Sequence, residues 1–101
     1  MRVKAMISVI PIGVGVSLSQ YIAACERVLE EAGLTRQLHA HGTNIEGEWD
    51  EVMGAVKRCH ERVHAMGAGR IATFIKLGTR TDREQSMVQM VRSVEEKVRV
   101  S

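Results

Sequence analysis

A short central stretch of the sequence gathers side chains that could bind a small polar ligand. Within residues 41–48, a hydroxyl (Thr43), an amide (Asn44) and a carboxylate (Glu46) fall within four consecutive positions. The glycines around them suit a strand that belongs to a tight hairpin. Because strand side chains alternate between faces, Asn44 and Glu46 would share one face and Thr43 the other. The Asn44 and Glu46 pair could hydrogen-bond a small polar heterocycle, but spacing alone favours the alternative, a solvated outer strand.

The bulk properties of the chain indicate one globular domain over residues 1–101. Of its 101 residues, 45% are apolar and 26% are charged, which is ordinary for a globular protein. The net charge is +2, the two signs are interspersed, and only one Trp, one Tyr and one Phe are present. Nucleic acid is therefore not an expected partner, since its recognition needs a basic surface or several stacking rings.

The N-terminal segment and the two cysteines indicate the compartment in which the protein is expected. Arg2 and Lys4 precede an apolar run that resembles a signal peptide, but Pro11 interrupts the run and its alternation is that of a strand. No stretch reaches the roughly 18 apolar residues that a membrane span needs. Cys25 and Cys59 are too few for a disulfide scaffold and suit a reducing compartment. We expect a cytoplasmic protein with no membrane partner.

Hydrophobic periodicity predicts an α+β fold. Apolar alternation predicts strands, and helical spacing predicts helices, in the order strand 2–10, helix 18–32, strands 35–40 and 43–48, helix 49–66, strand 70–77 and helix 83–98. This βαββαβ order plus a C-terminal helix is that of a ferredoxin-like sandwich, an antiparallel four-stranded sheet with two helices on one face. Met6, Ile10 and Phe74 would lie on the other sheet face, so we expect another subunit or the third helix to cover it.

Local signals mark the expected ends of these elements. Pro11 should end the first strand, because proline cannot donate to a ladder. Ser17 or Ser19 can cap the first helix, and Asp82 the third. The buried stripes of the three helices are expected at Leu18, Tyr21, Ile22, Cys25, Val28, Leu29 and Ala32, at Val52, Val56, Cys59, Val63 and Met66, and at Met87, Met90 or Val91, Val94 and Val98. Glu26 lies off the first stripe, and Gly33 and Gly67 should close the first two helices.

Two motifs could carry other chemistry. His60, Glu61 and His64 match H-E-x-x-H, in which paired histidines on a helix bind zinc and the glutamate acts as a base. The apolar stripe leaves both histidines on its flank, and no third ligand is evident, so we expect no metal site. Gly13 and Gly15 follow a strand and precede a helix, where an anion can bind. The third glycine of the dinucleotide fingerprint is missing, which favours a simple turn.

Three segments together resemble the small thiamine-binding protein family of bacteria and archaea, over essentially the whole chain. They are residues 8–15 with Tyr21 and Ile22, residues 42–47 and residues 70–82, with the pattern I-P-x-G-x-G, G-T-x-I-E-G and R-x-x-T-x-I-K-x-x-x-R-x-D. The resemblance implies a ferredoxin-like fold that assembles through its sheets into a homodimer or homotetramer. It also implies binding of thiamine or its hydroxymethylpyrimidine moiety as the small-molecule ligand, without catalysis and without a cofactor.

The expected ligand-binding residues are Ser8, Thr43, Asn44 and Glu46. Glu46 would pair with the ring nitrogen and exocyclic amine of an aminopyrimidine, and the other three would add hydrogen bonds. Strand alternation allows only some of the four to share one pocket. Asn44 stands where we expect an aliphatic residue in many relatives, so ligand preference can differ here.

The leading hypothesis is a non-enzymatic carrier, buffer or sensor of thiamine or a related pyrimidine. No nucleophile with a base and an orienting group is visible in the sequence. A regulatory module that senses another metabolite at its subunit interface is the first alternative. A small metal-dependent enzyme using His60, Glu61 and His64 is the second, and a purely structural role is the third.

Overall fold

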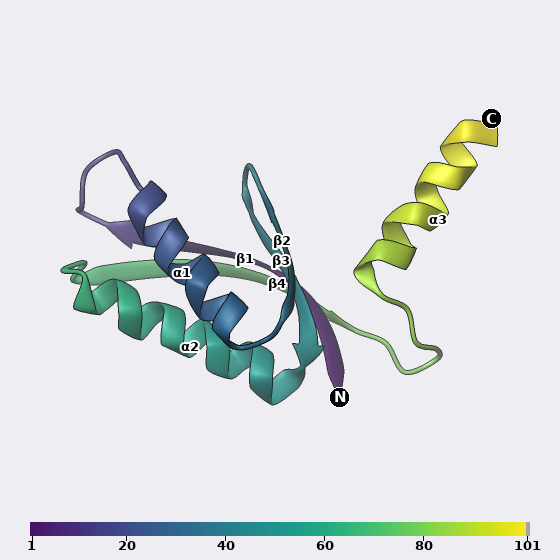
Figure 1. Ribbon diagram of the computed structural model, residues 1–101, viewed down its shortest axis with the longest axis horizontal. Coiled ribbons are helices and arrows are strands. Elements are labelled where there is room, and N and C mark those ends of the chain that lie inside the picture. The colour runs from purple at the N-terminus through teal and green to yellow at the C-terminus, as the bar shows by residue number, and fades with distance from the viewer. Residues whose placement is uncertain (101) are drawn as a thin grey trace.

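The computed structural model describes residues 1–100 as a two-layer sandwich with an additional helix. The elements are β1 (Arg2–Ile12), α1 (Ser19–Glu31), β2 (Thr35–His39), β3 (Gly42–Glu48), α2 (Trp49–Ala65), β4 (Arg70–Thr79) and α3 (Met87–Val100). The four strands form one antiparallel sheet in the order β2-β3-β1-β4. Helices α1 and α2 lie side by side on one face of this sheet (Figure 1). The ferredoxin-like α+β fold predicted from periodicity is therefore confirmed.

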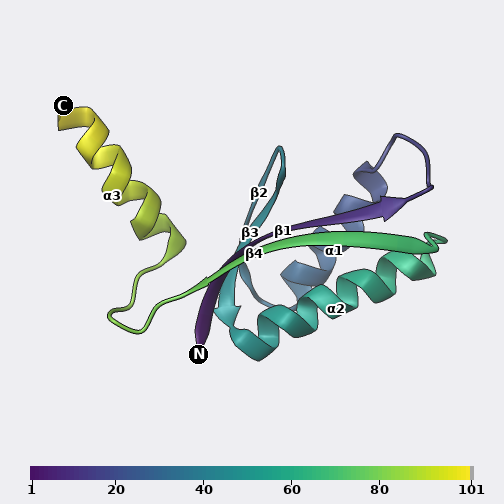
Figure 2. The same cartoon turned by 180° about the vertical axis from the view of Figure 1, so that it is seen from behind.

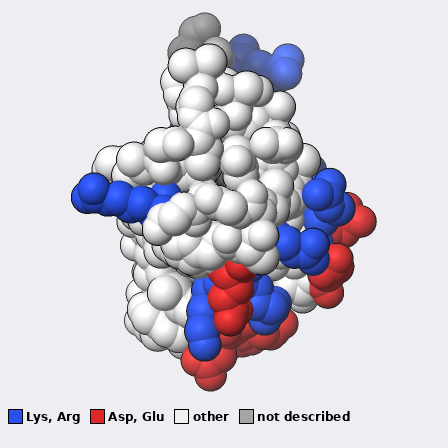
Figure 3. All heavy atoms as spheres, turned by 90° about the vertical axis from the view of Figure 1, so that its left-hand side faces the viewer, with Lys and Arg blue, Asp and Glu red and all other residues white. Residues whose placement is uncertain are grey.

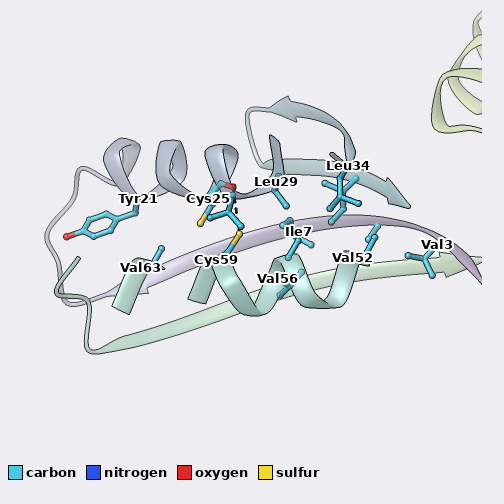
Figure 4. Close-up of a cluster of buried hydrophobic side chains, with 14 of the residues drawn as sticks. Val3, Ile7, Tyr21, Cys25, Leu29, Leu34, Val52, Val56, Cys59 and Val63 are labelled. Atoms are coloured by element: carbon cyan, nitrogen blue, oxygen red, sulfur yellow. Dashed lines mark hydrogen bonds between the residues drawn. The ribbon is translucent and has the colours of Figure 1, made fainter. Parts of the chain in front are cut away.

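The core lies between this helix-bearing face and the two helices (Figure 4). The register pairs Val3, Ala5 and Ile7 of β1 with Gly47, Ile45 and Thr43 of β3, so odd-numbered residues of both strands face the helices. The side chains with 0% exposure are Leu29, Ile45, Val52, Ala55, Cys59 and Val63. Ile22 and Met66 were expected on the buried stripes, but 39% and 37% of their surfaces are exposed; Met66 lies at the C-cap of α2, beyond its last turn.

The predicted C-terminal ends of α1 and α2 are confirmed, as is the start of α2 at Trp49. Gly33 and Gly67 follow these helices with φ of +72° and +105°, the backbone region that glycine adopts without strain. The prediction that Ser17 or Ser19 caps α1 is wrong. Leu18 occupies the cap position, and no side chain hydrogen-bonds the first turn. Serine supplies the chemistry of a cap, but the path of the loop decides whether its oxygen reaches the turn.

Pro11 does not end β1, contrary to the prediction. The strand continues to Ile12, and Pro11 stands opposite Ile71 of β4. On its other side β1 is paired with β3 only from Arg2 to Ile7. Beyond Ile7 the strand therefore has one free edge, which is the setting in which a sheet tolerates proline.

Helix α3 begins later than predicted, at Met87 instead of residue 83. Asp82 does not cap it, since both of its carboxylate oxygens accept from Arg80 at 2.6 and 2.9 Å. Ser86 and Gln89 cap it instead. The backbone N–H of Gln89 donates to Ser86 Oγ at 3.2 Å, and the backbone N–H of Ser86 donates to Gln89 Oε1 at 2.8 Å. This reciprocal pair is a capping box, which the sequence S-x-x-Q could have indicated.

Helix α3 stands away from the sandwich, as Figure 2 shows from behind. None of its residues is buried, although Met87, Met90, Val91, Val94 and Val98 form the predicted apolar stripe. The Cα radius of gyration is 15.2 Å, larger than the roughly 13 Å of a compact domain of this length. Phe74 on the helix-free sheet face remains 66% exposed. We expected either another subunit or the third helix to cover this face. In the structure, α3 of the same chain leaves Phe74 exposed and does not cover it.

The start of β3 offers a test of the packing. A Cβ added at Gly42 would lie 2.7 Å from the carbonyl oxygen of Ile7 and 2.8 Å from Met6 Sδ. Because the first of these atoms is backbone of the central strand, Gly42→Ala should destabilise the protein by about 1–3 kcal/mol. Thermal unfolding should show a midpoint lower by several degrees.

Gly69→Ala is the matched control, since no atom lies within 4 Å of the added Cβ. It should leave the midpoint unchanged within a degree or two. Equal midpoints for the two variants would contradict the close approach of β3 to β1 at Gly42.

Candidate functional site

The helix-free sheet face carries a hollow of about 560 Å³ beneath the start of α3, called here the open-face hollow. Its walls combine apolar side chains of β1 and α3 with amide and cationic groups of the sheet. The lining residues used below are Lys4, Met6, Asn44, Lys76, Arg80 and Met87. Even-numbered residues of β1, β3 and β4 face this side, because the odd-numbered ones face the helices.

Glu46 lies beside this hollow, in a second one of about 510 Å³ called the rim hollow. Lys4, Arg80 and Gln85 line both hollows, so the two are adjacent. The Glu46 side chain is buried, and its Oε1 accepts from the backbone amide of Met87 at 3.3 Å. A carboxylate at the first amide of a helix is favoured by the exposed N–H groups there. Glu46 therefore links β3 to α3.

Asn44 keeps its amide nitrogen available to a ligand. The His41 backbone N–H donates to His39 Nδ1 at 3.4 Å. His39 Nε2 lies 3.1 Å from Asn44 Oδ1. This contact orients the Asn44 side chain through its oxygen and leaves its NH₂ group as a donor on a residue that lines the open-face hollow.

Thr43 and Ser8 line a third hollow, a notch of about 310 Å³ between β1, the β2–β3 hairpin tip and α1. Thr43 Oγ1 donates to Glu26 Oε2 at 2.8 Å, and Arg36 donates to Glu26 Oε1 at 2.9 Å. Glu26 was placed off the buried stripe of α1, yet its side chain is only 13% exposed. The β2 strand causes this burial, because Arg36 reaches across α1 from it. No helical periodicity could have indicated this partner.

The structure brings together two of the four predicted binding residues. Asn44 and Glu46 share the helix-free face, whereas Thr43 lies on the helix side, as strand alternation required. Ser8 lines the notch and not the open-face hollow. Lys4 and Lys76 were not among the site residues expected from the sequence. Each of these lysines lies between apolar residues within a predicted strand, and this pattern in the sequence could have indicated them.

Arg80 is held in place at the edge of the open-face hollow. Its guanidinium binds Asp82 through two nitrogens and donates a third bond to Gln85 Oε1 at 2.7 Å. The same guanidinium holds the pKa of the Asp82 carboxyl at about 2, below its ordinary value of 3.8. Asp82 is therefore ionised at neutral pH and balances the charge of Arg80.

The two histidines of the H-E-x-x-H match each have a protein partner. His60 Nε2 lies 2.6 Å from Thr73 Oγ1, and His64 Nδ1 donates to the Ala68 carbonyl at 2.7 Å. Their ring centroids are 6.3 Å apart. Within residues 1–100 no group of three or more His, Cys, Asp or Glu side chains is arranged to hold a metal ion.

Cys25 and Cys59 are buried free thiols on the facing sides of α1 and α2, as predicted (Figure 4). Cys59 Sγ donates to the Cys25 carbonyl at 3.8 Å. Its hydrogen bond with Cys25 and its burial raise the pKa of the Cys59 thiol above the ordinary value of 9.0. Cys59 is thus a protonated packing group at neutral pH rather than a nucleophile.

The outer surface gives no sign of a large single-charge area at the end that carries the β1–α1 loop. Figure 3 shows acidic and basic side chains intermixed toward the lower edge of that view, with a largely uncharged surface above them. The loop itself, residues 12–18, contains no charged residue. Among residues 1–100, none of the helices combines the length and apolar character needed to cross a membrane.

Comparison with known proteins agrees with this fold. Residues 5–95 match the model of a family described as thiamine-binding protein. A UPF0045 protein of Synechocystis sp. is 61% identical over 99 residues, covering 93% of this chain and 82% of its own length. A UPF0045 protein of Eremothecium gossypii is 41% identical over 93 residues, covering 91% of this chain and 89% of its own.

Solved structures share the same architecture. A hypothetical protein from Methanocaldococcus jannaschii superposes with a TM-score of 0.86 at 30% identity, over 94% of this chain and 97% of that one. A Thermotoga maritima protein, described as a candidate thiamine biosynthesis or salvage protein, superposes with a TM-score of 0.80. Its identity is 19%, over 93% of this chain and 99% of that one, so it shows the fold alone. By sequence and by fold, the chain belongs to the thiamine-binding protein family.

Proposed function

We propose that this protein binds thiamine or its hydroxymethylpyrimidine moiety, without catalysis, as a carrier, buffer or sensor in the cytoplasm. The family match over residues 5–95 supports the ligand class. The observation that carries the proposal is the buried Glu46 carboxylate beside a hollow with apolar walls and a free amide donor. The reduced state of the two free thiols suits the proposed compartment.

Glu46 is the better of the two buried carboxylates for reading an aminopyrimidine. Glu26 already accepts from Arg36 and Thr43, one on each oxygen. Glu46 accepts a single hydrogen bond of 3.3 Å among the described residues, and a carboxylate has room for about four. It can therefore accept from the exocyclic amine and pair with the protonated ring nitrogen, which makes the contact charge-assisted.

The rest of the open-face hollow suits a flat ring. Asn44 supplies an amide donor from the same sheet face as Glu46. Met6, Met87 and Met90 supply flexible apolar surface around it, and thioethers adapt readily to aromatic rings. Thr43 has no part in this arrangement, because it lies on the opposite face of the sheet and donates to Glu26.

The proposed absence of catalysis is consistent with the position of the His60–Thr73 contact, an imidazole beside a hydroxyl. Within residues 1–100, the imidazole–hydroxyl contact between His60 and Thr73 joins α2 to β4. Thr73 is an odd-numbered residue of β4 and so faces the helices, on the other side of the sheet from the hollow. A ligand bound between Asn44 and Glu46 would not meet that pair.

A homodimer or homotetramer is the proposed state of assembly. None of the residues of α3 is buried, and Val94 of its apolar stripe is 62% exposed. Phe74 leaves a second apolar area open on the sheet face. Surfaces of this kind are characteristic of contacts between subunits. A second copy that covers both would also enclose the open-face hollow, which lies between them.

The ligand assignment predicts a specific thermal shift. Hydroxymethylpyrimidine or thiamine at about 100 times its dissociation constant should raise the unfolding free energy by about 2.7 kcal/mol. Glu46→Gln keeps the shape but loses the charge, so affinity should fall roughly 10- to 100-fold, and the stabilisation at the same ligand concentration should fall to about 1.4 to 0.4 kcal/mol. Differential scanning fluorimetry of the two proteins, with and without each ligand, measures this.

Glu48→Gln is the control for this experiment. It removes the same charge from the same face of β3, but Glu48 binds the N-terminal amine at 2.9 Å and lines neither hollow. Its ligand shift should equal that of the unchanged protein. Identical shifts in Glu46→Gln and Glu48→Gln would overturn the role of Glu46. A shift with another metabolite and none with these ligands would favour the regulatory module.

The assembly proposal predicts a mass change from one substitution on α3. Light scattering should give the protein a mass of at least two chains of 11.2 kDa. Val94→Glu places a charge in the apolar stripe and should yield a monomer. Arg92→Glu puts the same carboxylate off the stripe and should leave the mass unchanged. A monomeric parent protein at micromolar concentration would contradict the proposal.

A further inference from the structure

We propose that the ligand of the open-face hollow is a phosphate ester, with its phosphate bound by Lys4 and Lys76. This inference rests on the proposed function, since it adds a phosphate group to the pyrimidine ligand proposed there. It assigns roles to two residues that the recognition of the ring leaves unused. The geometry of the sheet, the lack of partners for both lysines and the charge of the hollow point to it.

The sheet places the two lysines next to each other. Lys4 of β1 stands opposite Gly78 of β4, and Lys76 stands opposite Met6. Lys4 and Lys76 are therefore diagonal neighbours on adjacent strands, with the separation of about 7–8 Å typical of that relation. Both are even-numbered, so both face the helix-free side, and both line the open-face hollow. Two ammonium groups on flexible stems at this spacing can converge on one phosphate.

Neither lysine is held in an ion pair within residues 1–100. Among residues 1–100, neither Lys4 nor Lys76 forms an ion pair or a side-chain hydrogen bond. Lys4 stands opposite Glu46 in the β1–β3 register, yet the Glu46 carboxylate binds the Met87 amide instead. Two like charges at diagonal positions on one sheet face repel each other, and an anion between them would turn this repulsion into attraction.

The charge of the whole hollow selects against the unphosphorylated cation. Lys4, Lys76 and Arg80 line it, and among residues 1–100 no carboxylate does. Arg80 is balanced by Asp82, so the two lysines account for the uncompensated charge. The thiazolium ring of thiamine is itself a cation and is repelled by them. A phosphate monoester carries roughly −1.5 to −2 charges at neutral pH and three acceptor oxygens, which reverses the interaction.

The position of Glu46 completes the fit. Glu46 lines the rim hollow together with Lys4, on the far side of Lys4 from Lys76. A ligand whose pyrimidine is read by Glu46 and whose phosphate lies at the lysines would thus span the two adjacent hollows. Lys4 would contact both of its ends. The ligand class that fits is a phosphorylated pyrimidine, either thiamine phosphate or hydroxymethylpyrimidine phosphate.

Calorimetric titration of the full chain tests this inference. The probes are thiamine, thiamine monophosphate, hydroxymethylpyrimidine and its phosphate, each titrated at two salt concentrations. The phosphate esters should bind at least tenfold more tightly than the parent compounds, since each phosphate gains two charge-assisted contacts. Their affinity should also fall more steeply with salt.

Two lysine variants and a control locate the effect. Lys4→Gln and Lys76→Gln should each reduce the ratio of ester affinity to parent-compound affinity about tenfold. Lys57→Gln removes the same charge from an exposed position of α2, on the other side of the sheet, and should change nothing. Circular dichroism of each variant should match the parent protein, which excludes a loss of fold.

The outcomes separate this inference from the proposed function. Equal affinity for esters and parent compounds would overturn the inference and leave the proposed function standing. A preference for esters that survives both lysine substitutions would also overturn it, because the phosphate would then lie elsewhere. Binding of none of the four compounds would overturn the proposed function, and the inference with it.

Discussion

The pairing of β1 with β3 on one side and β4 on the other is the constraint on which the rest of the structure depends. Because side chains of a strand alternate, this single register assigns each residue of three strands to one of two faces. Val3, Ala5 and Ile7 go to the helices and form the core. Lys4 and Met6 go to the open side and form the hollow. A shift of one residue would exchange the two sets.

Glu46 joins the two parts of the molecule that are otherwise separate. It belongs to the central region of the sheet, and it accepts from the first amide of α3, a helix with no buried residue of its own. The candidate ligand group and the docking of α3 therefore share one carboxylate. In the proposed complex, the ligand and the Met87 amide would both be hydrogen-bonded to this carboxylate.

Polar groups within the sandwich divide into satisfied and available ones, and this division identifies the site. Glu26 is enclosed between Arg36 and Thr43, and His60 and His64 each contact a neighbouring oxygen. No buried side-chain nitrogen or oxygen within residues 1–100 lacks a partner. Groups with unused bonding capacity gather on the helix-free face instead. Polar groups without partners do not stabilise an otherwise apolar sheet face, so their presence there indicates a binding role.

Much of this protein was determined by local pattern alone. Apolar alternation and helical spacing predicted all seven elements, and the glycines after α1 and α2 marked where those helices end. The same alternation assigned Thr43 to one face of its strand and Asn44 and Glu46 to the other. These predictions succeeded because strand and helix periods depend on backbone geometry, which every sequence shares.

Only the tertiary structure decided which neighbours each residue meets. Pro11 stays within β1 because the pairing with β3 does not extend beyond Ile7. Glu26 is largely shielded because Arg36 of β2 packs against it and donates to its carboxylate. Asp82 binds Arg80 and leaves the cap of α3 to Ser86. Lys4 and Lys76 lie far apart in the sequence, and the β1–β4 register alone makes them neighbours. Local sequence specifies what a residue can do, whereas partners distant in the chain decide what it does.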